Sequence, residues 1–145
     1  MEFVDKLLDE KNNDYSWTPQ YGDMKQLKEA LLYKRIVKWD ENELHLEDGT
    51  IVTLETSEQD CCAGAIGKFK EVELDAVITD IKISEMETIS EDEYDGTTNA
   101  VEVFIFHNQN TIAKANMEAD DGNGGYYYSV GSIVIDNVHF PIVEA

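Results

Sequence analysis

The 145-residue chain carries 31 acidic residues against 11 Lys and Arg, a formal net charge of -20, with 42% hydrophobic residues. This length fits one domain. The aromatic and aliphatic content is enough to fill a core, which excludes disorder of the whole chain. No run of about 18 apolar residues could cross a membrane as a helix. The N-terminus lacks a signal-peptide pattern, so we expect a cytosolic protein.

The distribution of acidic and basic residues along the chain limits the kinds of molecule that the protein can bind. Residues 40–145 hold 24 acids against 4 bases and carry the entire net charge. Such a chain is repelled by duplex nucleic acid and by anionic membranes, which excludes both as bulk partners. A small anionic ligand is compatible, because a pocket needs only a few local donors. Acidity of this kind commonly serves solubility; the alternative is an acidic surface that imitates DNA and occupies a DNA-binding enzyme.

Residues 1–34 are expected to be the helical part of the chain. Apolar residues at helical spacing predict a short amphipathic helix over residues 2–11, followed by a loop over residues 12–22. Asp23 is a candidate N-cap for a second helix from Met24 to about Lys34.

Residues 35–145 change to a period of two and predict strands. The expected strands cover residues 36–39, 43–46, 50–54, 73–83, 101–106, 111–117, 126–130, 132–136 and 138–143. Residues 84–99 and 118–125 are expected loops, and the Asp48-Gly49 and Asp136-Asn137 pairs are expected turns. The pattern predicts one α+β domain over residues 1–145, with short N-terminal helices followed by a mostly antiparallel β-sheet.

The adjacent Cys61 and Cys62, with Ser57 nearby, are candidates for a catalytic nucleophile. The base would be a histidine that meets them only in space: His45, His107 or His139. No nucleophile signature surrounds either cysteine, and cysteine is among the most buried residue types, so we expect both to pack in the structure. We expect no catalytic residue.

No metal or cofactor is expected either. The five Cys and His residues are scattered without zinc-ligand spacing. Residues 120–125 superficially resemble a calcium loop, but Tyr128 stands six residues after Gly122, where such loops need a bidentate Glu.

The glycine-rich residues 121–125 and the three tyrosines after them suggest a ligand site. Successive glycines allow backbone amides to converge on phosphate oxygens. On a strand, Tyr126 and Tyr128 would share one face and could stack on a nucleobase. The alternative is a glycine hairpin followed by ordinary edge-strand tyrosines.

Two segments carry a resemblance to a known family. They are residues 48–50 followed by residues 57–62 with the double cysteine, and residues 116–129 with the core DGNGGYYYS. Together they resemble small phage proteins that share a double-cysteine and Gly-Tyr-Tyr-Ser pattern, among them the Thoeris anti-defence sponges of the first type. The similarity covers roughly residues 34–143.

The resemblance implies a function without catalysis. Such a protein binds glycocyclic ADP-ribose in the cytoplasm of the infected host cell and withholds it from the effector that triggers cell suicide. It also implies homodimers that hold the signal at their interface; some members of the family assemble further into hexamers that also hold cyclic oligonucleotides.

Site residues follow from the resemblance and the residue chemistry together. The amides of Asn123, Gly124 and Gly125 would bind phosphate, Tyr126 or Tyr128 would stack on the base or bond the ribose, and Asp121 would bind ribose hydroxyls. Phe106 and Asn108, with Phe104 beside them, would complete the base pocket. A pyrophosphate also calls for cations, for which Arg35 and Lys114 are the candidates, with Lys114 expected opposite the glycine-rich segment.

Three functions therefore stay open from the sequence. The first is the nucleotide sponge, and the second is the acidic, DNA-mimicking inhibitor of a host enzyme. The third is an enzyme that acts on a nucleotide, with Cys61 or a histidine as its catalyst.

Overall fold

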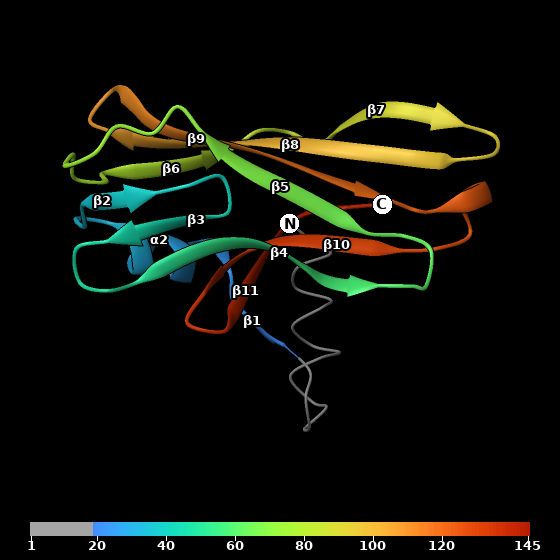
Figure 1. The fold of residues 1–145 in the computed structure, drawn as a ribbon, viewed down its shortest axis with the longest axis horizontal. Coiled ribbons are helices and arrows are strands. Elements are labelled where there is room, and N and C mark those ends of the chain that lie inside the picture. The colour runs from blue at the N-terminus through green and yellow to red at the C-terminus, as the bar shows by residue number, and fades with distance from the viewer. Residues whose placement is uncertain (1–18) are drawn as a thin grey trace.

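Two β-sheets pack face to face in the computed structural model, which describes residues 19–145 (Figure 1). The helix expected over residues 2–11 lies outside this range. One sheet has six strands in the order β1-β11-β10-β4-β3-β2; the other has five, β5-β9-β8-β6, with β7 pairing β8 beside β6. All pairs are antiparallel except β1 with β11. The elements are β1 (Gln20–Tyr21), α2 (Met24–Leu31), β2 (Ile36–Trp39), β3 (Glu43–Leu46), β4 (Ile51–Gln59), β5 (Ala65–Lys70), β6 (Asp80–Ile83), β7 (Glu87–Asp92), β8 (Gly96–His107), β9 (Asn110–Asp120), the 3-10 turn η1 (Asn123–Gly125), β10 (Ser129–Ile135) and β11 (Val138–Glu144).

The predicted α+β class is wrong, because within residues 19–145 the only α-helix is α2 and the chain is mainly β. The helix starts as expected: the Asp23 side chain accepts from the Gln26 amide at 2.9 Å, and the Gln26 side chain accepts from the Asp23 amide. This capping box satisfies two donors that a helix start leaves open. The helix ends at Leu31, earlier than expected, because Leu32 is already extended.

The long hairpin of β8 and β9 explains why more of the chain is strand than expected. Residues 84–99, expected as a loop, contain β7 and the start of β8. Every residue of β7 is exposed. The strand therefore has no buried face, and its sequence lacks the alternation of polar and apolar residues that predicts a strand. Similarly, β9 continues to Asp120, into the second expected loop.

Two other expected strands are shorter in the structure than the sequence predicted. The strand expected over residues 73–83 is regular only in β6, because Asp75 has a φ of 67° and residue 77 makes only an isolated bridge to Arg35. The strand expected from Tyr126 begins only at Ser129. The two predicted turns are confirmed. Asp136 and Asn137 both have positive φ, as a tight two-residue hairpin requires, and Gly49 has a φ of 90°.

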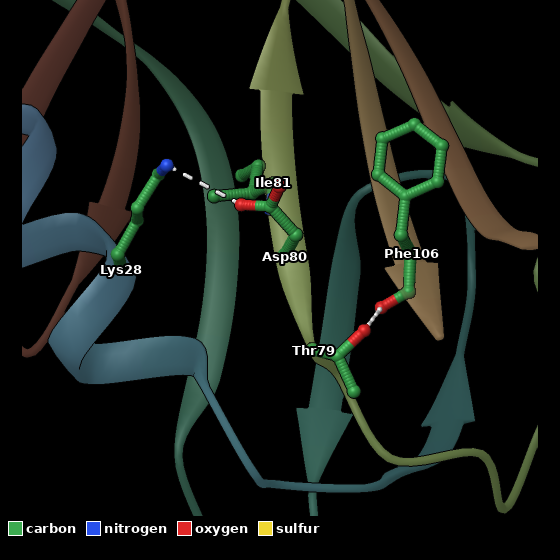
Figure 2. A network of polar contacts seen from close by, with 5 residues as sticks. All are labelled: Lys28, Thr79, Asp80, Ile81 and Phe106. Atoms are coloured by element: carbon green, nitrogen blue, oxygen red, sulfur yellow. Dashed lines mark hydrogen bonds and ion pairs between the residues drawn. The ribbon is translucent and has the colours of Figure 1, made fainter. Parts of the chain in front are cut away.

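The core lies between the sheets, where α2 adds Leu27 and Leu31 to apolar residues from both. Alternate residues of β8 and β9, and Phe69 of β5, point inward and are buried, while their neighbours form the opposite, outer face of the five-stranded sheet. Figure 2 shows how the edge of this sheet is tied: Lys28 of α2 reaches Asp80 at 3.3 Å, and the Thr79 hydroxyl donates to the carbonyl of Phe106. None of the helices in residues 19–145 is both long enough and apolar enough to cross a membrane.

Candidate functional site

Three lysines and a phenylalanine lie in register across the outer face of the five-stranded sheet. Lys70 of β5 pairs with Lys114 of β9, Lys114 with Phe104 of β8, and Phe104 with Lys82 of β6. Directly opposite residues on neighbouring antiparallel strands have Cβ atoms about 4.5–5.5 Å apart. The four side chains, which we call the lysine row, therefore form a continuous band of three cations around one aromatic ring.

Neighbouring groups fix the electrostatics of the lysine row. The Lys114 ammonium lies 3.0 Å from the Glu71 carboxylate and holds the pKa of Glu71 below its usual value. The Lys82 ammonium lies 5.7 Å from the centre of the Phe106 ring, a favourable cation–π placement. Asp80 accepts from the Ile81 amide and turns towards Lys28 (Figure 2). The band therefore keeps excess positive charge in a chain that is otherwise strongly acidic.

The outer face is hollowed next to the lysine row. A depression of about 350 Å³ is lined by residues that include Ile66, Lys68 and Lys70. A second depression, of about 480 Å³, is lined by Glu85, Glu87 and Glu102 among others. Both are also lined by Asn116 and Glu118, so the two adjoin. The face changes from basic to acidic along its length.

The chemistry of this face suits a nucleotide. Ammonium groups bind phosphate oxygens, and an aromatic ring stacks on a base. A carboxylate can accept from ribose hydroxyls, a role open to Glu118 and Glu102 beyond the row. The lysine row thus offers partners to phosphate and to a base, and the acidic depression offers partners to sugar hydroxyls.

The glycine loop, residues 121–128, follows the open end of the β8–β9 hairpin, beside the β7–β8 turn (right side of Figure 1). Most of its glycine amides and its carboxylate are bonded within the chain. The Asp121 carboxylate accepts from the Thr97 amide at 2.6 Å, and the Gly124 amide donates to the Tyr94 carbonyl at 2.8 Å. The Gly125 amide donates to the Gly122 carbonyl at 3.2 Å. Phosphate could bind these glycine amides only by replacing those carbonyls.

The three tyrosines after the glycines are not on a strand and do not form one platform. Tyr126 is 87% exposed, whereas Tyr128 is half-buried against Tyr21 and Val130. Tyr127 lies against the cysteine turn instead. The prediction that Tyr126 and Tyr128 share a strand face is therefore wrong.

The structure divides the predicted ligand residues among three places. Asp121, Asn123, Gly124, Gly125, Tyr126 and Tyr128 lie in the glycine loop. Lys114 lies in the lysine row, with Phe106 and then Asn108 following at the end of β8. Arg35 lies before β2 of the other sheet, where it donates to the Asp75 carbonyl at 2.9 Å and approaches Glu47.

The predicted pairing of Lys114 with the glycine segment is wrong, because Lys114 is the fifth residue of β9 and the glycine segment begins only after the last residue, Asp120. The partners of Lys114 are Lys70 and Phe104. Sequence reasoning missed Lys70 and Lys82, and the only signal for them is strand register, since each is separated from Lys114 by tens of residues.

A serine–histidine pair lies on the six-stranded sheet. β4 carries one extra residue, Ser57, because Glu58 pairs with Val130 and Thr56 pairs with Gly131. This bulge re-aims the side chain, and the Ser57 hydroxyl lies 2.7 Å from Nδ1 of His139 and 2.5 Å from the buried Ser132 hydroxyl. Burial lowers the pKa of His139, which favours the neutral ring. A neutral imidazole can accept a serine proton, so this pair is the most concrete support for the enzyme alternative.

Cys61 and Cys62 are both exposed, so the expectation that they pack in the interior is wrong. Both thiols are free. In the part of the chain that the structure describes, no cluster of three or more His, Cys, Asp or Glu side chains could hold a metal ion.

Comparison with known proteins places the chain in one family. No curated protein and no solved structure matches it. One family model, described as "Domain of unknown function (DUF7448)", matches residues 29–134. The match spans every strand from β2 to β9 and thus the whole lysine row and the double cysteine. The chain belongs to this DUF7448 family.

Proposed function

We propose that the protein is a phage anti-defence sponge that binds a cyclic ADP-ribose-type signal and withholds it without degrading it. The observation that carries this proposal is the lysine row, in which Phe104 stands between Lys114 and Lys82 on an open sheet face. The resemblance at residues 57–62 and 116–129 supplies the ligand class. A sponge needs affinity and no turnover, so cations and an aromatic ring suffice.

The magnitudes of these contacts supply a large part of the binding free energy that capture requires. A nanomolar Kd corresponds to about 12 kcal/mol. Stacking on an aromatic ring contributes about 1–3 kcal/mol per base, and each hydrogen bond to a charged group about 1.5–3 kcal/mol. One base on Phe104 and a pyrophosphate held by Lys70 and Lys114 account for roughly half of this. A second copy closing over the open face would add the rest, so we propose a homodimer as the binding form.

The test is retention of the intact signal. Purified protein is incubated with glycocyclic ADP-ribose, freed of unbound ligand, heat-denatured and the released material chromatographed. The proposal expects unaltered signal, recovered only after denaturation. An altered product would replace the sponge with an enzyme and make Ser57 and His139 the first residues to change. Absence of retained ligand would overturn nucleotide binding.

The acidic inhibitor is the second candidate, favoured by one specific observation. Strand β7 is exposed at every residue, and the depression beside it carries Glu85, Glu87, Glu102 and Glu118. Binding of a cationic protein to this surface should weaken steeply with added salt, because exposed charges are screened. Retrieval of a host enzyme that elutes at about 0.5 M salt, with no retained nucleotide, would favour this function over the sponge.

A further inference from the structure

The double cysteine forms a feature of its own, outside the lysine row. Cys61 and Cys62 occupy the turn between β4 and β5, where both side chains are exposed. Their sulfur atoms lie only 2.6 Å apart, so the two thiols converge on one point in front of the turn. Each thiol therefore has the other as its nearest chemical partner.

The turn around the thiols is held at both ends. The Asp60 amide donates to the Tyr128 carbonyl at 2.9 Å, and the Ala63 amide donates to the Asp60 carbonyl at 3.3 Å. One step further along, the Asp120 amide donates to the Gly64 carbonyl at 3.0 Å. The cysteine turn is thus anchored to both ends of the glycine loop, which fixes the two thiols in place.

The turn and the glycine loop also interlock through side chains. A Cβ atom at Gly122 would lie 2.6 Å from the Cys62 carbonyl oxygen and equally close to the Tyr127 ring. The Tyr127 hydroxyl interacts with both thiols, and the bond to Cys62 is the main cause of its raised pKa. A group bound by the thiols would therefore meet Tyr127 directly.

The spacing selects the chemistry of the ligand. Thiol sulfur is a soft donor and prefers soft centres. A linear two-coordinate ion needs its two sulfurs on opposite sides, which adjacent thiols converging on one point cannot supply. An internal disulfide is equally disfavoured, because adjacent Cα atoms are about 3.8 Å apart and disulfides usually need about 4.4–6.8 Å. A pyramidal centre binds both sulfurs on one side, and the two exposed side chains need only move slightly apart to hold it.

We infer that Cys61 and Cys62 form a dithiol site for a soft, trivalent, pyramidal centre of the arsenic(III) type. With phenylarsine oxide, both S–H bonds break, two S–As bonds form, and the oxide oxygen leaves with both protons as water. Arsenic stays trivalent, so no oxidant or reductant is needed. The site goes beyond the proposed function and does not depend on it.

Phenylarsine oxide itself is the probe. Intact-mass measurement should show one adduct on the native chain that survives excess monothiol and is removed by a dithiol. Either Cys61→Ser or Cys62→Ser should lower retention under monothiol challenge at least about tenfold. A tyrosine difference spectrum should accompany the adduct and disappear in Tyr127→Phe, while Tyr126→Phe serves as the matched control.

Three results would overturn the inference. They are an adduct equally stable in either single-serine variant, no adduct on the folded native chain, and monovalent copper retained by the native chain more strongly than the arsenical against a competing chelator. The serine variants differ by one atom at an exposed turn, so circular dichroism should show them folded. Ligand retention by the lysine row should be unchanged in both, which keeps this test separate from that of the sponge.

Discussion

The lysine row crosses the β8–β9 hairpin in the half nearer its turn, the glycine loop follows its open end, and the two are built in different ways. The glycine loop is contiguous in sequence, and the fold uses its amides and the Asp121 carboxylate for internal hydrogen bonds. The lysine row comes from four strands, and the register of those strands alone aligns Lys70, Lys114, Phe104 and Lys82. A conspicuous motif can thus serve architecture, while a ligand surface is assembled from residues that nothing links along the chain.

The charge of the two ends differs as strongly as their construction. No Lys or Arg follows Lys114 in the chain, and the one charged residue of the glycine loop itself is Asp121. Asp120 and Asp121 lie in or next to it, and Asp92 and Asp95 lie in the facing turn. An anion approaching this end meets repulsion, whereas one approaching the lysine row meets three ammonium groups. This comparison leads to predictions that distinguish ligand binding at the lysine row from a structural role of the glycine loop.

Charge reversal in the lysine row should give the largest effect. The double variant Lys70→Glu/Lys114→Glu removes two phosphate partners, each a charged hydrogen bond of about 1.5–3 kcal/mol. Affinity for glycocyclic ADP-ribose, measured by calorimetry, should fall at least about 100-fold.

The matched control makes the same change in net charge elsewhere. Lys25 and Lys38 are both exposed, on α2 and on β2 of the other sheet. The variant Lys25→Glu/Lys38→Glu should change affinity less than about threefold. Equal losses in both double variants would mean that net charge, and not the row, governs binding.

Alanine at Gly122 should give the largest loss of stability at the loop end. Gly122 has a φ of 74°, and a Cβ there would collide with the Cys62 carbonyl. We expect a loss of about 2–3 kcal/mol in the free energy of unfolding by urea, from backbone strain and the clash together.

Gly49 provides the control for backbone strain alone. Its φ is 90°, but a Cβ there would have no atom within 4 Å. Gly49→Ala should therefore cost only about 1 kcal/mol. A Gly122→Ala variant as stable as Gly49→Ala would contradict this prediction, because it would show that the cysteine turn and the glycine loop move apart at little cost in free energy.

Aromatic truncation compares the two ends directly. Phe104→Ala should weaken ligand binding about tenfold, the equivalent of about 1.4 kcal/mol, because a stacking ring is lost. Tyr126→Ala should leave binding unchanged, although Tyr126 is the more exposed ring at 87%. The reverse order of effects in calorimetry would return the ligand to the glycine loop.

The sequence predicted what depends on local chemistry. The Asp23 cap, the tight turns and most strands of the six-stranded sheet follow from neighbouring residues, and the structure confirms them. β7 could not be predicted, because its residues are exposed on both faces and its pairing with β8 is the only cause of its extended form.

In the candidate site, too, the sequence predicted some residues from their type but not those that only strand register brings together. Lys114 and Phe106 were named from residue type, yet Lys70 and Lys82 join them only through register. The cysteines were expected in the interior from the statistics of their residue type, but both lie in the turn between β4 and β5, which leaves the two thiols exposed.

The smallest expected effect is on the pH dependence of stability and concerns His139, which lies outside the lysine row and the glycine loop. It tests whether the His139 ring is neutral, as a partner that accepts the Ser57 proton must be. Burial lowers its pKa in the folded protein below the value of about 6.5 for an unfolded chain. As pH falls below about 6.5, His139 becomes protonated in the unfolded chain but stays neutral in the folded protein. The folded state is therefore progressively destabilised until its own lower pKa is reached, where the loss levels off. Urea unfolding of the native protein should show this extra decline relative to His139→Gln. Parallel profiles for the two proteins between pH 7 and pH 5 would mean that His139 titrates alike in both states and is no neutral partner for Ser57.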